Sequence, residues 1–385
     1  MRYGTGNSQT SIPPESSLSR RDFFKKSAAA AVGATMLGAG FSSALAEKEL
    51  TVNGLPAVVL GRTGLKVTRI SFGGILITEP PVLLRAIDQG INFIHTAPGY
   101  TNGRSIEAFG KAMKTHRKKV VLALKERPEN LDAALKQLNT DYVDILVPPM
   151  HDLSSINFPT VKASFEKAKK AGKCGFMGFS CHNNMAAVLD RASELGYYDV
   201  VLLGYSNAGD PQFLEAAGKA VEAGIGIMAM KGLPKRGSDG SMPEEAALAT
   251  SRCTSMLARE HAHTVLASMG SFQSVDFYHG VLETKLGYIS PRLEEHYWAM
   301  QDGNYCSMCG KCTGICPQGV EIRRIVRYRM YQRDYGLNDY ARSRYAALAP
   351  GCGAENCDRC GLCEKVCTRG LPLTAMLGEA NRLLA

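Results

Sequence analysis

The sequence predicts an α/β protein, built as a closed (β/α)8 TIM barrel that is followed by a small helical domain rich in cysteine. Two observations predict the barrel: apolar, β-branched runs alternate with stretches of helical periodicity between residues 58 and 270, and eight such runs are present. A third observation predicts the second domain, because residues 306–367 hold two cysteine motifs of the same spacing. The chain of 385 residues is 45% apolar, which is enough for both cores.

The expected strands and helices follow one another in a regular order. Strands are expected at residues 66–74, 91–97, 119–125, 142–148, 174–180, 199–205, 224–231 and 264–270. Helical stretches include residues 82–89, 130–138, 158–172, 185–195, 211–224 and 244–261. Eight parallel-type strands with seven helical connections, and a further helical stretch after the eighth strand, are typical of a closed barrel. An open doubly wound sheet is the alternative, but no Gly-x-Gly-x-x-Gly follows the first strand.

Two copies of one cysteine motif lie in the last part of the chain. They read Cys306-x-x-Cys309-x-x-Cys312-x-x-x-Cys316-Pro317 and Cys357-x-x-Cys360-x-x-Cys363-x-x-x-Cys367. Eight thiolates at this spacing predict two 4Fe-4S clusters. Structural zinc and disulfides are the alternatives, but the third and fourth cysteines of each motif fit neither of them well.

The spacing also predicts how the cysteines divide between the clusters. The two C-x-x-C steps form a tight loop whose three sulfurs point at one cluster, while the fourth cysteine is turned toward the other. We expect Cys306, Cys309, Cys312 and Cys367 around the first cluster, and Cys357, Cys360, Cys363 and Cys316 around the second. Of the remaining cysteines, Cys174 and Cys253 are interpreted as small buried apolar residues. Cys352, five residues before the second motif, is a candidate spare ligand.

The first 46 residues have the pattern of a twin-arginine export signal. Ser19-Arg20-Arg21-Asp22-Phe23-Phe24-Lys25 precedes a mildly apolar run that ends in Ala44-Leu45-Ala46. We expect cleavage after Ala46 and a periplasmic location, with an uncleaved anchor helix as the alternative. Twin-arginine transport carries folded proteins, which suits clusters assembled before export. The expected domains are therefore the signal at 1–46, the barrel at 47–295 and the cluster domain at 296–385.

Charge gives no argument for a nucleic-acid partner. The formal net charge is +9, of which the signal contributes +3, and two clusters with their thiolates add about −4. A basic and aromatic stretch between the cysteine motifs is predicted to form an amphipathic helix. Its apolar residues are Ile322, Ile325, Val326, Met330 and Tyr331. Its arginines are expected to face water, the anionic clusters or an acidic redox partner, and no stable membrane span is expected after signal cleavage.

Several barrel segments resemble those of an aldo/keto reductase. They are Leu60-Gly61-Arg62-Thr63-Gly64-Leu65-Lys66-Val67, Gly73-Gly74, Gly90-Ile91-Asn92-Phe93, Thr96-Ala97-x-x-Tyr100 and Asp141-Tyr142-Val143-Asp144, and the resemblance covers about residues 55–290. The tail carries Tyr335-Gly336-Leu337-x-x-Tyr340-Ala341-Arg342-x-x-Tyr345 between its motifs, and it resembles the helical ferredoxin-like extension that one branch of these reductases has. The resemblance implies reduction of a carbonyl by hydride from NADP(H).

The resemblance also implies a catalytic tetrad of Asp, Tyr, Lys and His at the barrel mouth. In that tetrad Tyr donates a proton, Lys lowers the pKa of the phenol and Asp orients Lys. Tyr100 and Lys125 match the Tyr and the Lys. His95 stands in place of the Asp and cannot supply its negative charge, and His151 is displaced by two residues from the position of the family's His.

The resemblance places a nicotinamide site at Gly73, Gly74, Ser180 and Tyr205, with Tyr205 matching the residue on which the ring stacks. Two departures argue against nicotinamide binding. Leu202 replaces the Gln that holds the carboxamide, and residues 272–283 contain no Arg or Lys for the phosphate. A buried phosphate without a cationic partner is costly.

Two functional hypotheses follow. The first is an exported iron-sulfur oxidoreductase that acts on a small carbonyl or quinone-type substrate and exchanges electrons with a carrier protein. The second is an electron-transfer protein whose barrel has lost reductase activity. A cluster passes single electrons whereas nicotinamide delivers hydride, and no flavin fingerprint is visible to convert between them, so we expect the clusters to supply the electrons. Cys181 and His182 also follow a strand at the mouth, but no His-x-x-x-His pair supports a metal site there.

Overall fold

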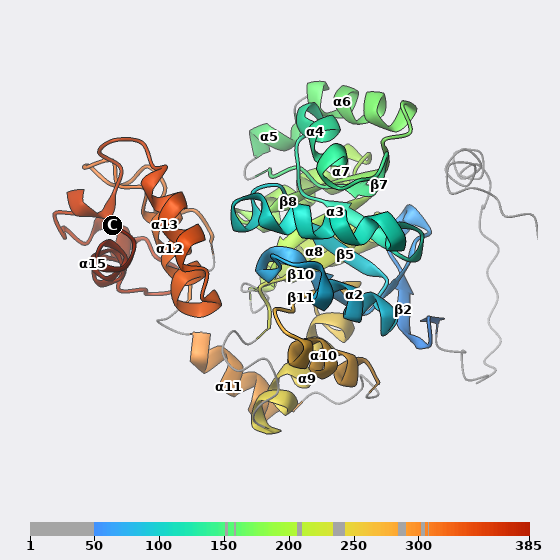
Figure 1. Cartoon of the computed structure of the whole chain (residues 1–385). Helices are drawn as coiled ribbons and strands as arrows, with labels where there is room; N and C mark the ends of the chain where they lie inside the picture. The colour runs from blue at the N-terminus through green and yellow to red at the C-terminus, as the bar shows by residue number, and fades with distance from the viewer. Residues whose placement is uncertain are drawn as a thin grey trace, which may run out of the picture. The chain divides into compact units, whose positions relative to one another are not determined.

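Eight parallel strands close into a barrel in the computed structural model of the chain, as the sequence predicts (Figure 1). The structure describes residues 50–150, 153–157, 159–205, 210–233, 243–283, 290–301, 305–306 and 308–385. The strands are β4 (Ile70–Gly73), β5 (Phe93–Thr96), β6 (Val121–Leu124), β7 (Val143–Leu146), β8 (Cys174–Cys181), β9 (Val200–Gly204), β10 (Gly226–Met230) and β11 (Thr264–Ser268). Around the barrel they follow the order β10-β11-β4-β5-β6-β7-β8-β9.

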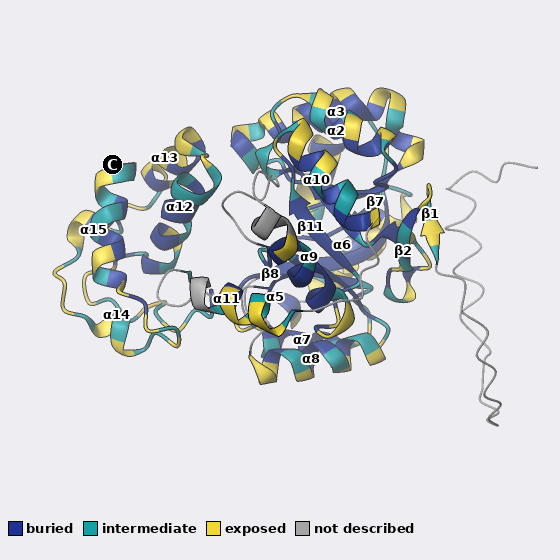
Figure 2. Cartoon of the chain, turned by 90° about the horizontal axis from the view of Figure 1, so that it is seen from below, coloured by how far each residue is buried: buried dark blue, intermediate teal, exposed yellow. Residues whose placement is uncertain are grey.

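The barrel strands are buried on both faces, which explains why they appear in the sequence as continuous apolar runs (Figure 2). Every residue of β4 to β9 is buried. One buried charge links two of the strands: Asp144 Oδ2 accepts hydrogen bonds of 2.8 Å from the backbone N–H of Leu122 and from Arg117 Nη2. Because the carboxylate is fully paired, it joins β6 to β7 without an uncompensated buried charge.

Helices surround the barrel and connect its strands. They are α2 (Pro80–Asp88), α3 (Arg104–His116), α4 (Leu131–Gln137), α5 (Leu153–Asn157), α6 (Pro159–Lys170), α7 (Met185–Leu195), α8 (Pro211–Glu222), α9 (Pro243–Ala258) and α10 (Phe272–Glu283). Each of the six helical stretches expected from the sequence overlaps one of these helices. Helix α7 ends where its pattern predicts because Gly196 takes the left-handed conformation, with φ 69°.

A small antiparallel sheet precedes the barrel, and the sequence patterns did not predict its first two strands. The single barrel strand expected at residues 66–74 is also divided: residues 66–68 form the third strand of this sheet, and the barrel strand begins at Ile70. The sheet consists of β1 (Thr51–Val52), β2 (Leu55–Val59) and β3 (Lys66–Thr68). Its residues bond to the segments that lead into β5 and β10: Asn53 Nδ2 donates to Gly90 O at 3.1 Å, and Arg62 N donates to Gly224 O at 2.7 Å. The sheet therefore covers the amino-terminal ends of barrel strands, opposite the mouth.

The C-terminal region forms a second hydrophobic core. Its helices are α12 (Ile322–Tyr335), α13 (Asn338–Ala346), α14 (Leu362–Lys365) and α15 (Leu373–Leu384), preceded by α11 (Pro291–Gln301). Helix α12 is amphipathic as predicted, with Ile322, Ile325 and Val326 in this core. The described residues from Leu50 onward belong to one compact unit, and Ile75, in the turn after β4, packs against the second core.

Arg329 of α12 does not face water, the clusters or a redox partner, although this is what the sequence predicts for the arginines of this helix. Its side chain is only 6% exposed and forms an ion pair with Glu379 of α15. The carboxylate from the neighbouring helix compensates the charge, so the guanidinium can lie inside the domain. Arg324, by contrast, is exposed as expected.

Two predictions lie outside the described residues: the export signal at 1–46 and the position of His151. Across the part of the chain that the structure describes, none of the helices combines the length and the apolar character needed to cross a membrane.

Candidate active site and cluster sites

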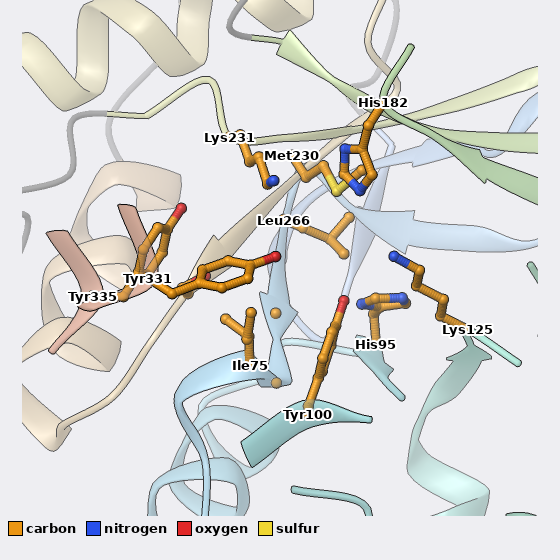
Figure 3. Close-up of a pocket in the computed structure, with 13 residues that line it drawn as sticks. Ile75, His95, Tyr100, Lys125, His182, Met230, Lys231, Leu266, Tyr331 and Tyr335 are labelled. Carbon is orange, nitrogen blue, oxygen red and sulfur yellow. The ribbon is translucent and has the colours of Figure 1, made fainter. Parts of the chain in front are cut away.

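A pocket lies at the carboxyl ends of the barrel strands, where barrel enzymes hold their chemistry (Figure 3). It is lined by Gly73, Gly74, Ile75, His95, Tyr100, Lys125, His182, Met230, Lys231, Leu266, Ser268, Tyr331 and Tyr335. All of these come from barrel strands or the turns that follow them, except Tyr331 and Tyr335 of α12. The cavity measures about 60 Å³, which is small beside the roughly 300 Å³ and more of typical ligand pockets.

Three of the four predicted catalytic residues line this pocket together. His95 lies in β5, Tyr100 follows β5 at the start of a 3-10 turn, and Lys125 follows β6. The rings of His95 and Tyr100 meet edge to face with their centroids 5.8 Å apart. Figure 3 shows the Tyr100 hydroxyl and the Lys125 amine pointing to the same region of the pocket.

Local backbone geometry positions Tyr100. Its N–H donates to Ala97 O at 3.1 Å, and the next two residues, Thr101 and Asn102, take left-handed conformations with φ 48° and 55°. Such conformations are uncommon for residues other than glycine and gather at functional sites. Thr101 Oγ1 donates to Ile77 O at 3.4 Å, which ties this turn to the segment after β4.

The pocket is basic. Burial, with a smaller effect of the Lys125 charge, lowers the pKa of His95 to about 3, so this ring is neutral at physiological pH. Burial also lowers the pKa of Lys125 to about 8, and the nearby charges of Arg327 and Lys231 act in the same direction. Burial and the neighbouring tyrosines raise the pKa of Tyr100 well above its usual value. Among the described residues that line the pocket, none is an aspartate or a glutamate.

Sequence reasoning did not assign Lys231, Tyr331 or Tyr335 to this site. Lys231 directly follows β10, so the rule that strand ends meet at the mouth could have found it. The two tyrosines belong to α12, and their place depends on how the C-terminal region packs against the barrel. Burial, with Arg327, lowers the pKa of Lys231 to about 7, and its Nζ lies 5.7 Å from the centre of the Tyr331 ring.

Two of the four residues predicted to bind a nicotinamide line the pocket, and two do not. Gly73 and Gly74 line the pocket, and a Cβ atom at Gly74 would come within 2.6 Å of the Phe109 ring, so this position needs glycine. Ser180 and Tyr205 are fully buried and do not line it. The Tyr205 hydroxyl donates to the backbone oxygen of Glu260 at 2.7 Å.

The cysteines of the second predicted cluster surround one cavity. It is lined by Cys316, Cys357, Cys360 and Cys363 together with Pro317, Ile322, Asp358, Gly361, Leu362, Thr374 and Leu377. The last cysteine of the first motif thus stands with the first three of the second motif, which is the grouping that the spacing predicts.

The cysteines of the first predicted cluster influence one another. Burial raises the pKa of the Cys306 thiol, and the thiols of Cys309 and Cys367 raise it further. Burial likewise raises the pKa of Cys312 to about 12, with contributions from Cys306, Cys309 and Cys367. No three His, Cys, Asp or Glu side chains among the described residues converge on a single ion.

Comparison with known proteins agrees with the barrel fold and with an iron-sulfur domain in the C-terminal part of the chain. Residues 80–233 match the sequence model of the aldo/keto reductase family, and residues 296–371 match that of the 4Fe-4S dicluster domain. The chain therefore combines a segment similar to the aldo/keto reductase family with a C-terminal segment similar to the 4Fe-4S dicluster domain.

Individual relatives match one part of the chain each. A probable voltage-gated potassium channel subunit beta of Oryza sativa is 33% identical over 131 residues, which is 27% of this chain and 40% of the relative. One subunit of the ferredoxin/F(420)H(2)-dependent CoB-CoM heterodisulfide reductase of Methanosarcina acetivorans is 34% identical over 82 residues, which is 20% of this chain and 44% of the relative. The chain thus spans less than half the length of these curated relatives.

Among solved structures, the holo form of the aldo-keto reductase AKR11C1 from Bacillus halodurans superposes with a TM-score of 0.52 and 19% sequence identity. The match covers 64% of this chain and 96% of the reductase. At this identity the likeness establishes the barrel fold alone.

Proposed function

We propose that this chain is an exported iron-sulfur oxidoreductase, which reduces or oxidises a small carbonyl or quinone-type substrate at the barrel mouth with electrons carried by two 4Fe-4S clusters. The observation that carries the proposal is the position of Lys231. This residue lines the mouth pocket, and its charge also acts on Cys306, a predicted ligand of the first cluster. The pocket and this predicted cluster ligand therefore lie close enough for the Lys231 charge to act on both, and such proximity favours electron transfer between them.

The eight cysteines are the proposed cluster ligands in the crossed grouping, because one set lines a single cavity and the other set interacts electrostatically. When bound, the clusters supply or accept electrons one at a time. Cys352 stands apart from the second cavity, and its backbone oxygen accepts from Glu321 N at 3.0 Å. It is therefore not included among the proposed ligands.

Reduction of a carbonyl to an alcohol consumes two electrons and two protons. Tyr100 stays protonated because its pKa is raised, and we assign it the proton that reaches the carbonyl oxygen with the first electron. The second electron and a second proton then form the C–H bond. Lys125 is mostly protonated at pH 7, since its pKa is about 8, and it supplies a proton to this site. Neutral His95 holds the substrate oxygen next to Tyr100.

Several features support cluster electrons in place of NADP(H). The cavity is small, Tyr331 and Tyr335 occupy one of its sides, and Leu202 is fully buried where a carboxamide holder is expected. The source of electrons is then a one-electron carrier protein, which exchanges them with the clusters.

The export part of the proposal is supported by the arginine pair at Arg20 and Arg21 and the apolar run that follows it. Replacing both arginines by lysine should leave the protein in the cytoplasmic fraction. Periplasmic recovery of that variant would overturn the proposal of twin-arginine export.

The activity is tested by reoxidation of the clusters. The cluster-replete full chain is reduced anaerobically, and the return of cluster absorbance is followed after addition of small carbonyl compounds and quinones. Tyr100→Phe should slow reoxidation by about 100-fold or more, because a positioned acid contributes on that order. Tyr197→Phe serves as the matched control, since Tyr197 lies outside the pocket and donates to Ile156 O. Equal rates in all three proteins would favour the electron-transfer alternative, in which the barrel is a scaffold.

A further inference from the structure

The mouth pocket contains two lysines and no compensating carboxylate among the described residues that line it. We infer that it binds a small carbonyl compound that carries its own carboxylate, of the 2-oxo acid class, and that Lys231 holds this carboxylate. The inference deepens the proposed function, on which its redox step rests, by naming the substrate class. A small carbonyl compound is also favoured over a quinone, because a cavity of about 60 Å³ suits a molecule of a few non-hydrogen atoms better than a quinone ring.

Lys231 is the residue that we expect to bind the substrate carboxylate. Its Nζ is buried and has no hydrogen-bond partner among the described residues. The contact that the structure gives it is with the face of the Tyr331 ring, 5.7 Å away. Arg327 and Lys125 lie nearby and add positive charge, while Cys306 acts in the opposite direction with a smaller effect than Arg327. Burial lowers the pKa of this amine to about 7, and an anion bound beside it would favour the charged form.

The backbone of the same residue has an unusual conformation. Lys231 has φ 59°, in the left-handed region that residues other than glycine rarely adopt. Gly232 follows it, and a Cβ atom there would meet the Met256 sulfur at 2.4 Å, so the chain is tightly confined at this turn. Two unfavourable features thus coincide at one residue of the pocket. Backbone strain of this kind gathers at functional sites.

The polar and charged groups lie on two sides of the pocket. Tyr100, His95 and Lys125 stand together on one side, and Figure 3 shows Lys231 beside Met230, on the other side of Leu266. A carboxylate at Lys231 would leave the adjacent carbonyl oxygen directed toward Tyr100. Leu266 lies between the two ends and, together with Met230 beside Lys231, provides an apolar surface that suits a short alkyl group.

The reaction that follows is balanced. A 2-oxo acid, R–CO–COO⁻, takes up two electrons and two protons and becomes the 2-hydroxy acid R–CHOH–COO⁻. The carbonyl π bond breaks, one proton goes to oxygen and one to carbon, and the carboxylate is unchanged. A reduced one-electron carrier protein is oxidised twice in each turnover, and the reverse reaction reduces it twice.

The test compares binding of pyruvate with that of its uncharged analogue pyruvamide. Titration calorimetry on the anaerobic, cluster-replete full chain should show pyruvate binding at least about tenfold tighter. Lys231→Gln should remove this preference by weakening pyruvate at least about tenfold while changing pyruvamide less than about twofold. Lys231→Arg should restore the preference. Lys114→Gln, at an exposed position of α3, should behave as the parent protein.

The outcomes separate this inference from the proposed function. Equal binding of the two probes, or a preference that survives in Lys231→Gln, overturns the inference even if neutral carbonyls reoxidise the clusters. A charge preference that depends on Lys231 supports it even if no compound reoxidises the clusters, in which case only the proposed function fails. Iron content of each variant confirms that the domain is intact. Tyr100→Phe should bind pyruvate normally, because it removes a proton donor and not a charge.

Discussion

At the scale of single residues, the replacement of an expected aspartate by His95 determines the charge around Lys125 at the barrel mouth. His95 stands at the position of that carboxylate and is neutral, because burial lowers its pKa to about 3. Lys125 therefore lacks the negative partner that this position would supply, and burial lowers its own pKa to about 8. The ammonium thus loses its proton close to physiological pH, where a lysine with a carboxylate partner would keep it.

The pH dependence of reoxidation follows from this lysine. The charged or titratable groups that face it are His95, Cys181, Lys231, Arg327 and Tyr331. The protonated form of Lys125 exists below its pKa, so with an uncharged carbonyl substrate, which does not need the charge of Lys231, the rate should be constant from pH 6 to about 7 and fall as the pH rises through about 8. Rates measured from pH 6 to 10 test this, and Lys125→Met should give a low rate without that fall. An unchanged fall in the variant would assign it to another group.

His95→Asp offers the converse experiment. An aspartate next to Lys125 favours the charged ammonium, so the pKa of Lys125 should rise. The fall in rate should then move to higher pH by about one unit or more, in the same reoxidation assay. His95→Asn, which adds no charge, is the control and should leave the midpoint near its original value. A midpoint that moves equally in both variants would mean that charge is not the cause.

Some residues of the site could be predicted from the sequence and others could not. Tyr100, Lys125 and His95 were found because each follows or ends a barrel strand, and parallel strands bring their ends together. Tyr205 matched a family position, yet its hydroxyl is bonded to Glu260 and the residue lies outside the pocket. Tyr331 was expected only as a core residue of a helix, since no local pattern indicates which barrel residues a distant helix will meet.

At the scale of elements, a buried ion-pair network joins α9 to α11. Arg252 of α9 is fully buried, and its Nη1 donates to Glu260 Oε1 at 2.7 Å and to Glu294 Oε2 of α11 at 3.1 Å. Its guanidinium also lies 4.5 Å from the centre of the Tyr297 ring. Helix α11 leads from the barrel into the cluster domain, so this network holds the connection in place.

Removing the arginine should therefore destabilise the protein strongly. Arg252→Met leaves Glu260 buried without its partner, and breaking a buried pair in this way costs about 3 to 5 kcal/mol. Urea denaturation of the anaerobic protein measures the loss. Arg259→Met, at an exposed position just after α9, should change the free energy of unfolding by less than about 0.5 kcal/mol. Similar losses for both variants would show that the network contributes little.

The sequence predicts best those strands whose residues are all buried. Strands β4 to β9 are buried throughout, so composition alone marks them. The two short strands β1 and β2 were not indicated, because two to five residues are too few for a pattern. The burial of Arg329 on α12 depends on Glu379, fifty residues further on, and periodicity cannot reveal such a pairing.

At the scale of the whole molecule, the C-terminal region forms one side of the pocket at the barrel mouth. Tyr331 and Tyr335 line the same pocket as Tyr100 and Lys125, where the nicotinamide ring of a hydride donor would be expected. We therefore expect neither NADPH nor NADH to bind the cluster-replete protein with a Kd below about 100 µM in calorimetric titration. Iron and sulfide are quantified on the same sample. Micromolar binding would contradict this and return the barrel to nicotinamide-dependent reduction.

The crossed grouping of cysteines makes a prediction about pairs of substitutions. Cys316 lines a cavity with Cys360 and belongs, in sequence, to the same motif as Cys309. If the ligands cross, Cys316→Ser and Cys360→Ser damage the same cluster, so the double variant should lose no more iron than either single variant, about four atoms of eight.

Combining Cys316→Ser with Cys309→Ser should instead damage both clusters and remove nearly all the iron. If each motif held its own cluster, the two double variants would behave in the opposite way, so iron analysis of the purified proteins decides between the arrangements. Cys352→Ser should retain both clusters and serves as the control for cysteine loss as such. The iron losses of two single variants do not add in the double variant only when both cysteines bind the same cluster. Iron analysis therefore identifies the ligand set of each cluster directly.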